Sequence, residues 1–208
     1  MKTLSKLACL HSASALCLFF CPTGWTQEII RIEEDWELHV SQPDEQLDAP
    51  QITTMMFPVG DDTDLILQVD LNHASWPAFQ RGGIQIRASY GEDTLDDVRQ
   101  FDGEPLDRES EIIRWTQVAQ KANHGFYFGV ISGTSFTWGA FGGDSSFVYV
   151  PYAESGSSRF ENYSSQASID NSSVTYASNR VQSLTLKKLR LYGSDGSVSE
   201  LTLNASAK

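Results

Sequence analysis

Cysteine is absent from most of this 208-residue chain, because Cys9, Cys17 and Cys21 all lie near its N-terminus. We expect that N-terminal segment to be removed from the mature protein. The remaining chain would then have no disulfide, no thiol nucleophile and no thiolate metal ligand. Its stability would have to come from the packing of a core, and the remaining length fits one domain.

Basic residues are also scarce. The chain has 15 lysines and arginines against 27 acidic residues, a formal net charge of −12. Loss of the N-terminal segment would remove two lysines and no acidic residue, taking the charge to −14. Such a field repels nucleic acids and anionic membrane surfaces, so we expect no nucleic-acid partner. Calcium, cationic surfaces and neutral glycans fit this charge better.

Long hydrophobic runs are absent except at the N-terminus. Lys2 and Lys6 precede an apolar stretch, Leu7–Phe20, of about 14 residues, which is short for a membrane span of about 20. We therefore interpret residues 1–26 as a signal peptide. The sequence predicts a secreted or periplasmic protein without a membrane span, in which residues 27–208 form a single domain.

Alternation of apolar and polar residues indicates β-structure along most of the chain. Residues 29–40 place apolar side chains on one face and acids on the other, with Glu34 the one acid on the apolar face. Residues 63–72 alternate too, with Leu67 facing inward and Asp70 facing outward. About ten such short runs, separated by turn signals, predict an all-β fold, a two-sheet antiparallel β-sandwich of the jelly-roll type.

Two segments interrupt this pattern. Residues 92–111 are acidic and do not alternate, and Thr94–Asp97 resembles a helix N-cap. We predict one short helix or turn there, within a long acidic loop. Residues 151–173 are rich in serine, which indicates an irregular surface loop.

Complementary charge predicts which strands pair. Glu33, Asp35 and Glu37 form a row of like charge that would destabilise a sheet unless its neighbours are basic. The densest basic cluster beyond the signal peptide lies in Val181–Tyr192. We therefore expect that strand to lie antiparallel beside Ile29–Val40. Its leucines change parity midway, which predicts a bulge near Lys187 and Lys188; Arg190 completes the cluster.

The order of strands resembles that of the concanavalin-A-like, laminin-G-like jelly rolls. The resemblance spans Glu28–Leu203 and rests on terminal strands at both ends and on the run RWTQVAQKANHGFYFGVISGTSFTWGAFGG. The stretches APQITT, SFTWGAFGG and YASNRVQSLTLK are also similar to uncharacterised exported bacterial proteins. The resemblance implies a fold and no particular activity.

A catalytic alternative rests on the run from Glu33 to Glu37. It resembles the E-x-D-x-E strand of laminarinase-type glycoside hydrolases, which implies a nucleophile at Glu33, an acid/base at Glu37 and a tuning role for Asp35. The run departs from that family at Glu34, where an aliphatic residue is expected, and in lying on the first strand. The Cα atoms of the two glutamates would also lie about 13 Å apart, whereas retaining chemistry needs carboxyl groups about 5–5.5 Å apart. A solvated acidic face explains the same pattern.

Two further sets of residues are candidate binding groups. Asp61, Asp62 and Asp64 gather carboxylates at one turn, which makes calcium a candidate ligand, although acidic turns are common. The other set is a sugar site, in which aromatic platforms stack on a pyranose and polar groups line an open sheet face. Its members are Trp76, Phe79, Gln68, Asp70, Gln85 and Arg87.

Together these features favour an exported, non-catalytic binding or surface-adhesion module, with a glycan or cell-surface polymer as its partner and no cofactor apart from the candidate calcium. The laminarinase-like hydrolase is one alternative. An extracellular structural protein with no small ligand is another.

Overall fold

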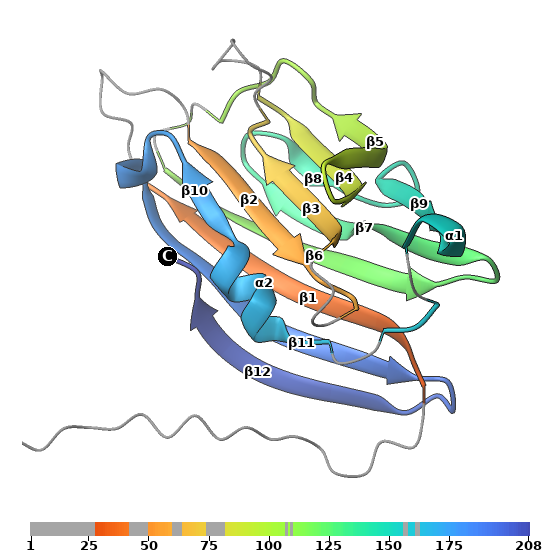
Figure 1. Ribbon diagram of the computed structural model, residues 1–208. Coiled ribbons are helices and arrows are strands. Elements are labelled where there is room, and N and C mark those ends of the chain that lie inside the picture. Colours follow the sequence, from red (N-terminus) through yellow and green to blue (C-terminus); the bar gives the residue numbers. More distant parts are fainter. Residues whose placement is uncertain are drawn as a thin grey trace, which may run out of the picture.

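Two antiparallel sheets pack face to face in the computed structural model (Figure 1). The structure describes residues 28–41, 50–59, 64–73, 82–106, 108, 110–155, 158–160 and 163–208. The expected all-β, two-sheet sandwich is thus confirmed. The signal peptide assigned to residues 1–26 lies outside the described residues.

The larger sheet, sheet A, has the order β12–β11–β1–β6–β7–β8, and β9 pairs with β7 beside β8. Its strands are β1 (Ile29–Val40), β6 (Glu111–Lys121), β7 (Gly125–Ser135), β8 (Gly139–Phe141), β9 (Phe147–Pro151), β11 (Val181–Gly193) and β12 (Val198–Ser206).

The smaller sheet, sheet B, has the order β10–β2–β3–β4–β5. Its strands are β2 (Gln51–Met56), β3 (Leu65–Leu71), β4 (Ile84–Tyr90), β5 (Asp93–Gln100) and β10 (Ser173–Thr175). The helical elements are α1 (Tyr152–Ser155), α2 (Ser165–Asn171) and the 3-10 turn η1 (Ser178–Arg180). Helix α2 packs against β2.

The core lies between the sheets, where alternation places the apolar faces of both. Leu67 and Trp115 are buried there, as their parity predicts. Trp36 of β1 stands directly opposite Trp115 of β6, and their stacked rings have centroids 6.3 Å apart. These two large side chains fill the centre of sheet A's inner face.

The predicted pairing of the terminal strands is confirmed. Strand β1 lies antiparallel to β11, with Glu33 opposite Arg190 and Asp35 opposite Lys188. Lys187 is an extra residue of β11 relative to β1, because Asp35 pairs with Lys188 and Trp36 with Leu186, so the predicted bulge is present. Strand β1 is bounded on its other side by β6 and is therefore central in sheet A.

The helix start predicted at Thr94–Asp97 is wrong, and the turn within residues 92–111 comes later, at Asp102 and Gly103. Residues 93–100 form β5, an edge strand that pairs with β4. A one-residue shift at Leu95 breaks its alternation, because Ala88 pairs with Asp96 while Ser89 pairs with Thr94. The strand is also mostly exposed, so its acids need no regular spacing.

The loop predicted for residues 151–173 is also wrong in part, since it contains α1 and α2. Helix α2 begins after Ser164 and has only seven residues, too few for a clear apolar stripe. Ser168 and Ile169 are its buried residues. Its position follows from packing against β2 rather than from local helix signals.

Asp70 has the predicted parity but is only 2% exposed, which corrects the expectation of a solvent-facing residue. Its carboxylate accepts hydrogen bonds from Thr53 Oγ1 at 2.6 Å and from Gln68 Nε2 at 2.7 Å. A side chain can thus point away from the core and still be buried when its sheet face is covered.

These contacts predict two unfolding phenotypes. Leu67→Ala should lower the free energy of unfolding by about 2–5 kcal/mol by leaving a cavity. Asp70→Ala should lower it by about 1–3 kcal/mol, because two buried donors lose their acceptor. Asp93→Ala, at an exposed position on β5, is the control and should stay within about 0.5 kcal/mol. Urea denaturation measures all three, and an Asp70 variant as stable as the Asp93 variant would contradict the assignment.

Candidate functional site

The acidic row of β1 lies on the outer face of sheet A, between β11 and β6. Arg190 joins two of its members: Nε donates to Glu33 at 2.6 Å, and the two Nη groups donate to Asp35 at 2.8 and 2.6 Å. This two-point contact fits the planar fork of a guanidinium. Thr116 of β6 donates a further bond to Asp35 at 2.7 Å.

Both glutamates of the row are held as carboxylates. Burial alone would raise the pKa of Glu33, but hydrogen bonds from Arg190, Arg31 and Tyr192 outweigh it and lower that pKa. Burial would likewise raise the pKa of Glu37, and contacts with His39, Arg114 and Lys187 lower it.

The catalytic alternative needs one of these glutamates to keep a proton near neutral pH, which requires a raised pKa. The lowered pKa values of Glu33 and Glu37 are those of an ion-pair network. The third member of the motif, Asp35, belongs to the same network through its two hydrogen bonds with Arg190. These ion pairs join β1 to its neighbouring strands β11 and β6.

Glu34 points the other way, into the core, and is fully buried. It accepts hydrogen bonds from Trp36 Nε1 at 3.0 Å, from Gln117 Nε2 at 2.7 Å and from the Tyr163 hydroxyl. Burial raises the pKa of Glu34 even though these donors oppose the shift. The carboxylate thus links β1 to the segment that enters α2.

The predicted sugar site on sheet B is brought together only in part. Gln68 lies opposite Arg87, and Asp70 lies opposite Gln85, so the four do share one face. Gln68, Asp70 and Gln85 are buried, however, and bond to protein groups; Gln85 donates to Asp97 at 3.0 Å. Trp76 and Phe79, the expected stacking platforms, lie outside the described residues.

The predicted calcium turn is described only at Asp64, which is exposed. Asp61 and Asp62 lie outside the described residues. Across the described part of the chain, no three histidine, cysteine or acidic side chains gather closely enough to hold a metal ion.

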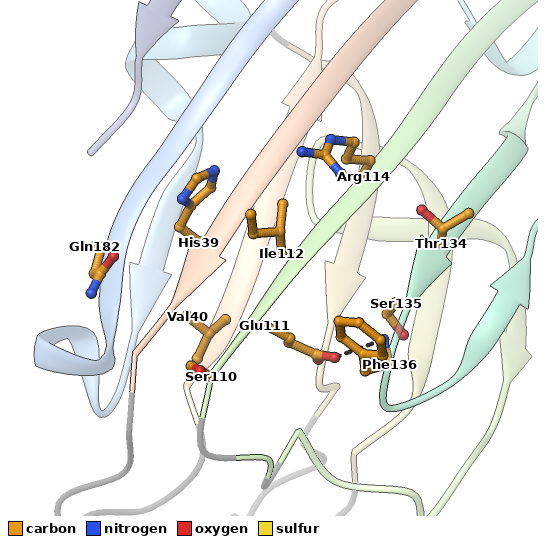
Figure 2. A pocket seen from close by; sticks show the side chains of 10 residues that line it. All are labelled: His39, Val40, Ser110, Glu111, Ile112, Arg114, Thr134, Ser135, Phe136 and Gln182. Atoms are coloured by element: carbon orange, nitrogen blue, oxygen red, sulfur yellow. Dashed lines mark hydrogen bonds between the residues drawn. The ribbon is translucent and has the colours of Figure 1, made fainter.

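An open depression of about 660 Å³ lies where β1, β6 and β7 meet at one end of sheet A. Figure 2 shows side chains from these neighbouring strands around it. Its lining residues are His39, Val40, Ser110, Glu111, Ile112, Arg114, Thr134, Ser135, Phe136 and Gln182. Its volume falls within the range of about 300–1,000 Å³ common for small-ligand sites.

Phe136, in the turn between β7 and β8, is the most exposed large apolar side chain of the described residues, at 73%. The turn is held by the buried carboxylate of Glu111, which accepts bonds from the backbone N–H groups of Phe136 and Thr137 at 2.8 and 2.9 Å. The Thr137 hydroxyl donates a third bond at 2.9 Å. An exposed aromatic ring is thus mounted on a fixed turn.

The alternation of residues along β7 does not predict that the ring of Phe136 is exposed. Phe126, Phe128 and Val130 face the core, which places Phe136 on the same face if the strand is regular. The register between β6 and β7 shifts by one residue at Ile131, so the later residues exchange faces. The signal that could have revealed Phe136 is its place in a turn, between Ser135 and Thr137.

The chain matches no protein-family model and no curated protein at a significant level. Within the described residues, none of the helices has the length and apolar character needed to cross a bilayer. The geometry of the depression is therefore the feature that bears on function.

The buried Glu34 yields a prediction about pH. Its pKa is raised in the folded state, so its favourable contribution is present below about pH 4.5 and is lost as the pH rises through the folded-state pKa. Glu34→Gln keeps two acceptor bonds and can donate to Tyr163, but carries no charge. As the pH rises from 5 to 8, the free energy of unfolding of the variant should therefore increase relative to that of the native protein, as measured by urea denaturation.

Glu33→Gln is the control, because the pKa of Glu33 is lowered. Its contribution is present above about pH 4.5 and is lost on acidification, so this variant should be less stable than the native protein at pH 7 and closer to it at pH 3. A Glu34 variant whose stability relative to the native protein is the same at pH 5 and pH 8 would contradict the assignment.

Proposed function

We propose that this protein is an exported, non-catalytic carbohydrate-binding module of the concanavalin-A-like type, and that it binds its ligand in the depression at the end of sheet A. The observation that carries the proposal is the exposed ring of Phe136 on a turn fixed by Glu111. Phe136 and Ile112 are both exposed and both line the depression, so apolar surface gathers there, and a gathered apolar patch is typical of a binding site.

An aromatic face suits the C–H face of a sugar ring, since both are apolar and flat. Polar side chains line the same depression as Phe136 and can bond to sugar hydroxyl groups. These are His39, Arg114, Thr134, Ser135 and Gln182. A large apolar contact beside a few polar groups that fix orientation is typical of small-ligand sites.

Preorganisation supports the proposal as well. The three hydrogen bonds to Glu111 hold the turn before a ligand arrives, so little conformational entropy need be lost on binding. Strands β1, β6 and β7 supply most of the other lining groups, and paired strands are rigid. A shallow site on a rigid sheet suits a polymer that must lie across it.

The test is glycan binding by the native protein and a Phe136→Ala variant. Loss of the stacking surface should weaken binding about tenfold or more, since burying an aromatic side chain contributes about 1.5–3 kcal/mol. A glycan array identifies the ligands, and titration calorimetry measures the change. Phe136→Trp keeps an aromatic face and should retain binding.

Tyr127→Ala is the matched control, because Tyr127 is also an exposed aromatic residue of β7 but is absent from the depression. It should bind like the native protein. Equal affinity of the native protein and the Phe136→Ala variant would place the site elsewhere. A native protein that binds no glycan would favour a structural role.

A further inference from the structure

The acidic row of β1 is not neutralised evenly along its length. At one end two carboxylates, Glu33 and Asp35, are matched by two guanidinium groups, those of Arg31 and Arg190. At the other end Glu37 alone meets Arg114 at 2.7 Å and Lys187 at 3.8 Å, and it also meets His39 at 3.0 Å. Positive charge is therefore in excess at the Glu37 end.

That end adjoins the depression, because His39 and Arg114 line it. The basic groups are also the more exposed ones: the side chain of Arg114 is 59% exposed and that of Lys187 is 41% exposed, against 17% for Glu37. The carboxylate of Glu111 also lines the depression, but it is buried and bonded to the turn. A ligand approaching from solvent thus meets the cations first.

Arg114 has spare donor capacity. Its Nε donates to Glu37, which orients the guanidinium plane. Within the described part of the chain, its two Nη groups have no hydrogen-bond partner, and Arg114 stands directly opposite Thr134 on β7. The two unused Nη groups form one edge of an oriented guanidinium, and that edge fits a carboxylate by two parallel hydrogen bonds.

We infer that the ligand is an acidic glycan whose sugar residues carry carboxylate groups. Arg114 binds a uronate carboxylate while Phe136 packs against the ring of the same chain. This inference rests on the proposed function and adds the ligand's charge. The net negative charge of the whole protein does not oppose it, because the interaction is local and salt screens distant charges over about 10 Å.

The test compares each uronate oligomer with its own methyl ester, which removes the charge and leaves the sugar backbone unchanged. The probes are oligomers of galacturonate, mannuronate and guluronate, measured by titration calorimetry at pH 7 and about 0.1 M salt, where distant charges are screened. At least one acid should bind about tenfold more tightly than its ester, the difference expected for a charge-assisted contact. Added salt should reduce that preference.

Arg114→Gln should abolish the preference for the acid, so that the variant binds acid and ester with equal affinity. Arg99→Gln is the matched control, since Arg99 is an exposed guanidinium paired with a single carboxylate, Asp97, on β5 of the other sheet. It should retain the full preference. Phe136→Ala should weaken acid and ester alike, which separates stacking from charge.

Each other outcome has a defined meaning. Native protein that binds acid and ester equally, or only neutral glycans, would overturn the inference and leave the proposed function standing. Absence of binding to any glycan would overturn both. Acid binding that Phe136→Ala does not affect would show general attraction to a polyanion, and would also overturn the inference.

Discussion

Arg190 bridges two carboxylates of the central strand of sheet A, and much of the sheet's arrangement depends on that contact. Strand β1 carries three acids in a row on its outer face. Strands with like charges beside them would be disfavoured there, so the neighbours must bring cations. Strand β11 supplies Arg190 and Lys187, and β6 supplies Arg114. Individual exposed pairs contribute only about 0–1 kcal/mol, so these charges act mainly on which strands pair.

The acidic row of β1 also reaches the depression, because its Glu37 end adjoins the residues that line it. Its Glu33 end is charge-balanced and closed by mutual hydrogen bonds, whereas its Glu37 end leaves exposed basic groups beside the depression. The outer face of sheet A is thus divided into a structural half and a half available to a ligand. Phe136 adds the apolar surface that a purely ionic contact lacks.

Glu34 shows the opposite use of a carboxylate on the same strand. It is buried among donors from β1, β6 and the segment before α2, and burial raises its pKa. A buried acid seldom adds net stability, but its hydrogen bonds can form in only a few arrangements of the surrounding elements. It therefore fixes where the segment entering α2 crosses the sandwich.

Regular alternation and complementary charge were enough to predict β1, its antiparallel pairing with β11 and the bulge at Lys187. They failed where the backbone itself is irregular. A shifted register at Leu95 hid β5, and another at Ile131 turned Phe136 outward. These two shifts lack the change of parity in a row of leucines that revealed the bulge at Lys187.

The residues expected to form a sugar site on sheet B show a different limit of sequence patterns. Alternation tells which residues share a face, and Gln68, Asp70, Gln85 and Arg87 do share one. It does not tell whether that face is covered. Three of the four are buried and bond to groups on their own sheet, such as Thr53 of β2 and Asp97 of β5, which alternation alone does not indicate.

The central claim, that the ligand lies at the Glu37 end of sheet A's outer face, is tested most directly by mapping backbone amide chemical shifts in NMR spectra during titration with a uronate oligomer. The account predicts that the largest changes fall on Ile112, Arg114, Gln182 and the turn at Phe136. Changes concentrated at Gln85 and Arg87 on sheet B, or at Arg190 in the closed half, would contradict it.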